Sequence, residues 1–371
     1  QGGFIWDWVD QTIIKQREDG TKWFAYGGDL GFVGVKNDSN FCANGLITSD
    51  RLFHPHANEV RKVYQYINFK EIDASKGKFE IINRHDFIDL SRYRIYYTIS
   101  AEGKVIKTAD LKFTSLAPQS YQAFGVDLSD LPQKAGTEYF IDFYTELLNS
   151  QPLLPARFIV ARDQFRIIKA ALAQKPKPVI VPDYKVSENE ILVSGTGFTM
   201  KFDTRQGMLK SYIFDGTELL VKGPLPNFWR APTDNDLGNS MPTLCAVWRE
   251  QSLKPGKVGV DIKTDSLGLV IAVRQQFAEV ALVTSLYHIS GNGTLRIDNT
   301  FKPLKNNLPE LPRLGMQFTL PAGFDSIAWY GRGPHESYSD RNTSAFVGLY
   351  KGNVWEQFHP YVRPQETGNK T

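Results

Sequence analysis

Apolar and polar residues alternate in short runs along most of this chain, and the pattern predicts strands more often than helices. The first run, residues 4–9, is apolar and aromatic and follows two glycines, which indicates a buried strand. Further alternating runs occupy residues 79–82, 93–99 and 139–144. We therefore expect a mainly β protein with many turns.

A helical pattern interrupts these runs near residue 55. A glycine-rich loop over residues 20–50 precedes it, and Pro55 marks the expected first turn. Apolar side chains then recur at three- and four-residue spacing, at Val60, Val63, Tyr64 and Ile67. This spacing predicts a helix with these four side chains on one face, which either packs on the neighbouring sandwich or stays exposed.

The strand pattern falls into two β regions. Residues 69–166 have the spacing and turns of an antiparallel sandwich of roughly 100 residues. Proline and charge interrupt the pattern at residues 175–178, which we interpret as a linker. A second, larger β region follows from residue 186 onward, and we expect hairpin turns in it at residues 215–216 and 291–293.

Composition argues against several classes of function. The 371 residues suit about two or three domains, and the net charge of +3 comes without the concentrated basic face of a nucleic-acid-binding protein. No run approaches the roughly 18 apolar residues of a membrane span. Cys42 and Cys245 lie far apart, so we expect two free thiols, with a single disulfide as the alternative.

Carboxylates and indoles come together in the first run, at Trp6, Asp7, Trp8 and Asp10. A pair of carboxylates could perform glycosidic chemistry, but Asp7 and Asp10 are three residues apart on a strand and project to opposite faces. We therefore expect a structural role for Asp10. Trp6 differs, because an exposed indole is a good platform for the apolar face of a sugar ring.

Other polar clusters have structural alternatives. The amide-rich stretch 37–45 suits a hard cation such as sodium, magnesium or calcium, yet such loops more often simply form turns. Arg230 lies near Asp234 and Asp236, and we expect a structural ion pair there. His335 and Glu336 are adjacent, so on a strand they face opposite ways and make no metal motif.

Several long motifs occur in a fixed order: QGGFIWDWVDQ, AYGGDLG, NDSNFCANGLITSDR, HPHANEVRKVYQ, NRHDFIDLSRY, FWRAPTDNDLGN, LPRLGMQF, WYGRGPHESYSDR and YVRPQETGN. Together they resemble the C-terminal portion of a large, multi-domain bacterial β-galactosidase of glycoside hydrolase family 2. The resemblance implies the last strand, loop and helix of a TIM barrel over residues 1–68 and an immunoglobulin-like β-sandwich over residues 69–174. For residues 180–371 it implies a galactose-mutarotase-like β-supersandwich, cut short at its C-terminus.

The resemblance also implies roles for individual residues. Trp6 matches the indole that lines the galactose site. Phe41 matches a phenylalanine that swings over the ligand and whose carbonyl contacts a sodium ion, and Asn44 matches an amide ligand of that Na⁺. Asn37 matches an asparagine of the neighbouring mobile loop, which is two residues longer here, so its role stays open.

The same resemblance places the reactive groups elsewhere. The retaining mechanism uses two glutamates about 5 Å apart, and both fall upstream of residue 1, as do the Mg²⁺ ligands and a third protein ligand of Na⁺. We therefore expect no catalytic residue here, and no activity from this chain alone. The implied partners are a galactoside, the missing N-terminal part of the same polypeptide and, at full length, further copies in a homo-oligomer, without nucleic acid or membrane.

Three alternatives remain open. The two β regions could form a non-catalytic carbohydrate-binding or assembly module, or the parent could prefer another glycone, such as a β-glucuronide. Aldose epimerase activity follows only from the likeness to mutarotases, and no pairing singles out His288, His335 or His359 as its acid or base. The compartment, cytoplasmic or periplasmic, is also left open.

Overall fold

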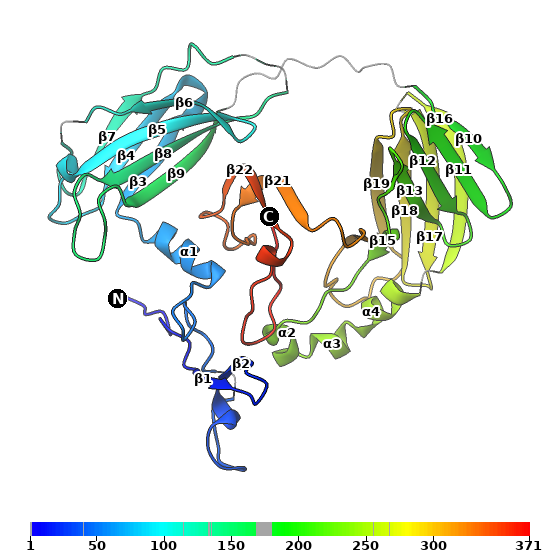
Figure 1. Cartoon of the computed structure of the whole chain (residues 1–371), viewed down its shortest axis with the longest axis horizontal. Coiled ribbons are helices and arrows are strands. Elements are labelled where there is room, and N and C mark those ends of the chain that lie inside the picture. The colour runs from blue at the N-terminus through cyan, green and yellow to red at the C-terminus, as the bar shows by residue number, and fades with distance from the viewer. Residues whose placement is uncertain are drawn as a thin grey trace. The chain divides into compact units, whose positions relative to one another are not determined.

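The computed structural model describes residues 2–39, 41–113, 115–132, 134, 136–167, 180–254, 256–266 and 268–371. The linker predicted at residues 175–178 and the first residue, Gln1, lie outside these ranges. The chain divides into two compact units, one of residues 1–174 with 326–371 and one of residues 175–325 (Figure 1). Within the described ranges, no helix has the length and apolar character needed to span a membrane.

The first unit begins with an irregular, exposed segment. Residues 4–8 form no regular strand, and Phe4 and Trp8 are 100% and 61% exposed. The prediction of a buried strand is therefore wrong for this segment: backbone hydrogen bonds join Asp7 and Trp8 to residues 44–47, but the apolar side chains stay exposed. A hairpin that the sequence did not predict follows, formed by β1 (Ile13–Gln16) and β2 (Lys22–Ala25). The short 3-10 helix η1 (Gly27–Asp29) comes after it.

The predicted helix forms as α1 (Pro55–Val63), with proline in its first turn. On its apolar face Val60 is half-buried, whereas Val63 and Tyr64 are 63% and 64% exposed; Ile67 is buried but begins the next strand. The opposite, polar side of α1 makes the contacts instead. Glu59 accepts from Ser344 N–H (2.9 Å), and Lys62 pairs with Asp163 (2.6 Å), so the neighbours of this helix are polar groups rather than an apolar floor.

An antiparallel sandwich follows α1, as predicted. Its strands are β3 (Ile67–Asp73), β4 (Lys78–Asn83), β5 (Tyr93–Ala101), β6 (Lys104–Asp110), β7 (Ser120–Gly125), β8 (Tyr139–Leu147) and β9 (Ile159–Ile167), with short 3-10 turns η2 (Ala74–Lys76) and η3 (Leu90–Arg92). One sheet has the order β3-β4-β7 and the other β6-β5-β8-β9. The strands predicted near residues 79, 93 and 139 are thereby confirmed.

Aromatic side chains fill the space between these two sheets. Phe143 of β8 is fully buried, and its ring centroid lies 4.7 Å from that of Phe69 and 4.8 Å from that of Phe79 on the facing sheet. Burying such rings removes a large apolar area from water, which is the main source of stability for a sandwich of this size. The first unit therefore has an apolar core of its own.

The C-terminal part of the chain returns to this sandwich. The hairpin of β21 (Ser326–Gly333) and β22 (Phe346–Asn353) precedes a 3-10 turn, η4 (Trp355–Gln357). The Gln164 side chain holds Val347 twice, accepting from its N–H (2.7 Å) and donating to its carbonyl (2.8 Å). The Arg162 guanidinium lies 4.0 Å from the Phe346 ring centroid, so β22 is fixed against β9.

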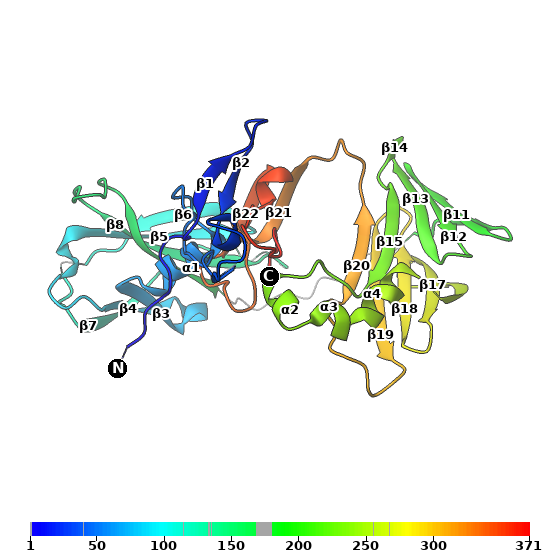
Figure 2. The ribbon, with the colours of Figure 1, turned by 90° about the horizontal axis from the view of Figure 1, so that it is seen from below.

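The second unit is a two-layered β structure with three short helices (Figure 1 and Figure 2). Its strands are β10 (Asp183–Val186), β11 (Glu190–Gly195), β12 (Phe198–Asp203), β13 (Met208–Phe214), β14 (Thr217–Glu218), β15 (Lys222–Asn227), β16 (Lys257–Asp265), β17 (Gly268–Phe277), β18 (Ala281–Ile289), β19 (Leu295–Pro303) and β20 (Gly315–Thr319). Its helices are α2 (Asp234–Gly238), α3 (Met241–Leu244) and α4 (Ala246–Leu253).

The sheets β10-β11-β12-β13-β14 and β16-β17-β18-β19 share an apolar core. Phe202 and Tyr287 meet edge to face within it, with ring centroids 5.1 Å apart. A second cluster, around Phe228 and Trp248, packs the helices against β17 and β18. The hairpin turns predicted at residues 215–216 and 291–293 join β13 to β14 and β18 to β19, as expected. Cys42 and Cys245 are both free thiols, also as expected.

Candidate sugar and cation site

Two segments of the first unit lie side by side and carry most of the predicted site. These are residues 6–11 and residues 41–47. Backbone hydrogen bonds join them from Asp7 N–H to Asn44 O (3.2 Å), from Leu46 N–H to Asp7 O (3.0 Å) and from Gln11 N–H to Cys42 O (2.8 Å). The structure therefore brings the segments of Trp6 and Asn44 together, although about 38 residues separate them in sequence.

The two segments approach so closely that only glycine fits at position 45. A Cβ atom added to Gly45 would lie 2.1 Å from Asp10 N and 2.8 Å from Ile47 O. The Gly45 N–H also donates to Asp10 Oδ1 (2.7 Å). The position next to Asn44 is thus fixed by backbone contact and by a carboxylate.

Two aromatic side chains of these segments stay exposed. Trp6 is 67% and Phe41 70% exposed, which is unusual for side chains of their size. The Phe41 N–H donates to Asp38 O (3.0 Å), which fixes the turn that carries the Phe41 carbonyl. Exposed indole and phenyl faces can pack on the apolar face of a sugar ring.

Asn44 has an acceptor without a partner. Its side-chain Oδ1 is buried and makes no hydrogen bond to any residue that the structure describes. Buried acceptors of this kind are rare in proteins and need an explanation, such as an ion. An amide oxygen is a hard ligand that suits Na⁺, so the residue fits the ion that the resemblance implies.

Asn37 is used locally. Its Nδ2 donates to Val35 O (3.1 Å) and its Oδ1 accepts from Ser39 N–H (2.9 Å). This is the turn-forming arrangement that asparagine adopts in loops. Both polar ends of the Asn37 side chain are therefore occupied, and a role in substrate binding stays a prediction.

The carboxylates of the first run are also engaged. Asp7 Oδ2 accepts from Gln11 Nε2 (2.9 Å). Asp10 is 3% exposed and accepts from Gly45 N–H and from His54. A carboxylate buried in this way holds structure together and does not reach a substrate, which agrees with the role expected for Asp10.

Behind the site lies a histidine pair that sequence reasoning missed. His54 Nε2 lies 2.7 Å from Asp10 Oδ2, and His54 Nδ1 lies 2.7 Å from His359 Nε2. The His54 ring stacks with the rings of His56 and Tyr361, at centroid distances of 5.2 and 5.6 Å. Burial lowers the pKa of His359 and that of His56. No spacing rule links residues 305 positions apart, so the sequence offered no signal for this contact.

Glu336 anchors the same C-terminal region. It is 5% exposed and accepts from Arg341 (2.8 Å), from Gly368 N–H (3.0 Å) and from the Tyr361 hydroxyl. Burial raises the pKa of Tyr361, and the bond to Glu336 adds to this rise. Tyr361 therefore stays a neutral donor at neutral pH.

Glu59 ties helix α1 to the loop before β22. It accepts from both the N–H and the hydroxyl of Ser344, at 2.9 and 2.8 Å. Burial alone would raise the pKa of Glu59, but the hydrogen bonds from Thr343 and Ser344 outweigh it and lower the pKa. The carboxylate is therefore held in its charged form.

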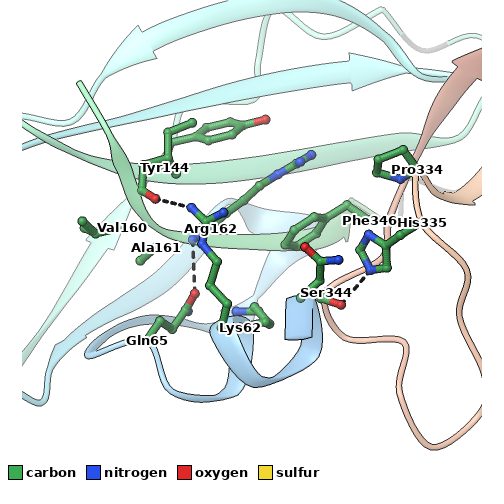
Figure 3. Close-up of a pocket in the computed structure, with 13 residues that line it drawn as sticks. Lys62, Gln65, Tyr144, Val160, Ala161, Arg162, Pro334, His335, Ser344 and Phe346 are labelled. Carbon is green, nitrogen blue, oxygen red and sulfur yellow. Dashed lines mark hydrogen bonds between the residues drawn. The ribbon is translucent and has the colours of Figure 1, made fainter. Parts of the chain in front are cut away.

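A cavity of about 280 Å³ lies between α1, β9 and this loop (Figure 3). Figure 3 shows Lys62 of α1 and Gln65, which follows the helix, facing Arg162 of β9, with Phe346 and His335 alongside. Lys62 and Arg162 on its wall have acidic partners, Asp163 (2.6 Å) and Asp142 (2.7 Å), and Arg61 donates to the Ile159 carbonyl (2.6 Å). We assign this cavity to the packing of the helix, since each of these three side chains already has a partner within the protein.

The sequence of the chain matches the models of three known protein domains. Residues 1–69 match the model "Glycosyl hydrolases family 2, TIM barrel domain", residues 79–168 match "Beta-galactosidase, domain 4", and residues 194–371 match "Beta galactosidase small chain". The chain belongs to glycoside hydrolase family 2.

Family members with curated names agree along the whole chain. A protein of Priestia megaterium named β-galactosidase is 40% identical over 100% of this chain and 36% of its own length. Proteins of the same name from Psychromonas ingrahamii and Halalkalibacterium halodurans are 32% and 31% identical, over 99% and 100% of this chain and 37% and 36% of their own. The chain thus spans a little over a third of the length of these family members.

The family match to the small chain covers parts of both compact units. Residues 326–371, which carry Glu336 and His359, belong to that match yet pack within the first unit. In the second unit, the motif around Arg230 is structural, as expected: Arg230 donates to Asp236 Oδ1 (2.9 Å), and Thr233 N–H donates to Asp236 Oδ2 (2.8 Å). The predicted site residues Trp6, Phe41 and Asn44 all belong to the first unit.

Proposed function

We propose that this chain is the C-terminal part of a retaining β-galactosidase that hydrolyses terminal, non-reducing β-D-galactosyl residues. The observation that carries the proposal is the buried, unpartnered Oδ1 of Asn44, which lies on a segment bonded to that of the exposed Trp6. The names of the family members support the same substrate class.

In this proposal the residues of the chain bind and position the sugar. Trp6 offers an apolar platform to the galactosyl ring, and Phe41 covers the ring from the neighbouring segment. Asn44 Oδ1 and the Phe41 carbonyl would hold Na⁺, which supplies positive charge for a sugar hydroxyl oxygen.

The groups that break the glycosidic bond are assigned to other residues of the parent polypeptide. Retaining hydrolysis needs an acid/base and a nucleophile about 5 Å apart, and we place both glutamates, with the Mg²⁺ ligands, upstream of this chain. The partners are then a galactoside and the N-terminal part of the same polypeptide. Assembly into a homo-oligomer stays a prediction.

The role of Asn44 can be tested in the whole gene product that contains this sequence. Asn44→Ala should raise the sodium concentration needed for half-maximal hydrolysis of an aryl β-galactoside by roughly tenfold or more, since one ligand is lost. Asn292→Ala, in an exposed turn of the second unit, is the matched control and should change nothing. An unchanged sodium dependence in Asn44→Ala would contradict the proposed cation site.

The division of labour can be tested with the chain alone. Purified residues 1–371 should not hydrolyse an aryl β-galactoside. Turnover that survives repurification would show that the reactive groups lie within this chain after all, and would overturn their placement upstream.

A further inference from the structure

The backbone beside Asn44 is held on both sides of one peptide bond. The carbonyl of Asn44 accepts from Asp7 N–H (3.2 Å), and the N–H of Gly45 donates to Asp10 Oδ1 (2.7 Å). The next carbonyl, that of Gly45, lies 2.9 Å from His56 Nε2. The direction in which the Asn44 side chain leaves the backbone is therefore set by these neighbours.

Asp10 stands at the centre of this arrangement. An ionised carboxylate only accepts hydrogen bonds, so Gly45 N–H and His54 Nε2–H both donate to it. Asp10 and His54 are each 3% exposed, so water is not at hand to replace either donor. Loss of either donor would leave the buried Asp10 carboxylate short of a hydrogen bond, which costs free energy. The position of Gly45 therefore depends on that of His54, because both donate to the same carboxylate.

The chain of hydrogen bonds continues to the other end of the sequence. With its proton on Nε2, His54 accepts at Nδ1 from His359 Nε2–H (2.7 Å), and His359 lies on the segment that follows β22 and η4. Tyr361 of the same segment stacks with His54 and donates to the anchored Glu336. Figure 1 and Figure 2 both show this red C-terminal segment beside the blue N-terminal one.

We propose that Asp10, His54 and His359 are positioning residues that couple the C-terminal segment to the backbone beside Asn44. In this arrangement His359 acts through His54 and Asp10. The coupling fixes the loop at residues 42–47 whether or not a ligand is present. Its importance for sugar and cation binding rests on the proposed function.

The proposal can be tested on the 371-residue chain by amide hydrogen exchange, without any ligand. His359→Leu removes the hydrogen bond to His54 and should speed exchange at residues 43–47 roughly tenfold, the effect expected from weakening a bond network that ends on a charged group. His359→Gln retains an N–H donor on a side chain of similar reach and should restore most of the protection. His85→Leu, at a half-buried histidine stacked on Tyr66, is the matched control and should leave residues 43–47 unchanged.

The coupling is overturned if His359→Leu exchanges at residues 43–47 like the unmodified chain. It is also overturned if His359→Gln and His359→Leu behave alike, because bulk packing rather than the hydrogen bond would then be responsible. If His359→Leu does not fold, ¹H–¹⁵N imidazole spectra of the unmodified chain test the proposal by showing which ring nitrogen of His54 carries the proton. His54 Nε2 must carry a proton there, and a His54 without a proton on Nε2 overturns the proposal.

A second measurement separates this proposal from the proposed function. In the whole gene product, His359→Leu should raise the sodium requirement and the galactoside KM several-fold, and His359→Gln should restore both. If exchange at residues 43–47 responds while both kinetic quantities stay unchanged, the positioning role stands and the assignment of Asn44 to a cation site fails.

Discussion

The sandwich β3–β9 and the junction between residues 6–63 and 326–371 are held together by different forces. The sandwich closes over stacked, fully buried rings such as Phe143. The junction uses buried polar groups instead, among them Asp10, His54 and Glu336. Apolar burial is nearly independent of pH and tolerates many neighbours, whereas each polar contact needs one particular partner. Fewer amino-acid substitutions should therefore be tolerated at the junction, which carries the candidate site, than in the apolar core of the sandwich.

The largest effect is expected in the sandwich. Phe143→Ala should lower the free energy of unfolding of the sandwich by about 3–5 kcal/mol, because it opens a cavity between two packed sheets. Phe87→Ala is the control in the same sandwich, since Phe87 is 94% exposed. Urea unfolding followed by circular dichroism measures both. Equal losses for the two variants would contradict the apolar core described here.

A smaller effect is expected at the junction. Glu59→Ala removes the acceptor of Ser344 N–H and Thr343 N–H and should weaken docking of the β21–β22 hairpin by roughly 1.5–3 kcal/mol, the value typical of hydrogen bonds to charged groups. Amide exchange in β22 reports this docking. Glu18→Ala, exposed in the turn between β1 and β2, is the control. Similar exchange in both variants would mean that the polar contacts do not hold the junction.

A pH effect should separate the two regions further. Burial lowers the pKa of His359, His56 and His335 below the ordinary histidine value of about 6.5. The unfolded chain then binds protons more readily, so this contribution to stability is complete above about pH 6.5 and is lost as the pH falls through the lowered values. Exchange at residues 354–371 should thus rise more between pH 7.5 and 5.5 than exchange in β8, after correction for intrinsic rates. An equal change in both regions would contradict the polar character of the junction.

The smallest effect is expected in the exposed N-terminal run. Phe4→Ala should change the free energy of unfolding by no more than about 0.5 kcal/mol, because the Phe4 side chain is fully exposed. The same urea experiment measures it. We also expect amides of residues 2–8 to exchange faster than those of β8. A loss comparable to that of Phe143→Ala would show that this run is packed against the protein.

Regular apolar patterns made the sandwich predictable from the sequence. Alternation identified β4, β5 and β8 because their inward side chains share one core. The same rule failed for residues 4–8, where backbone hydrogen bonds join Asp7 and Trp8 to residues 44–47 but the apolar side chains stay exposed. It identified α1, but Val63 and Tyr64 at its end are exposed, and the polar Glu59 and Lys62 make hydrogen bonds and an ion pair to the rest of the unit. Burial depends on which other elements pack against a segment, and the periodicity of a sequence does not show which elements these are.

The candidate site was predictable only where its residues belong to a long motif. Resemblance pointed to Trp6, Phe41 and Asn44, and the structure joins their segments by backbone bonds. It gave no hint of His359, since histidine occurs in many settings and no spacing rule spans the length of the chain. The unpartnered oxygen of Asn44 is likewise visible only in three dimensions.

The contact between His54 and His359 has a consequence for synthesis of the protein. The two histidines are 305 positions apart, and a ribosome adding roughly 5–20 residues per second needs about 15–60 s to cover that distance. During that interval the sandwich can fold, whereas His54 lacks its contact to His359 until that residue has been made. Nascent chains that end before His359 should therefore contain a folded sandwich, while the loop at residues 42–47 still lacks the support of the C-terminal segment. On the proposed coupling, synthesis of the segment around His359, and not the folding of the sandwich, sets when the loop at residues 42–47 takes its final place.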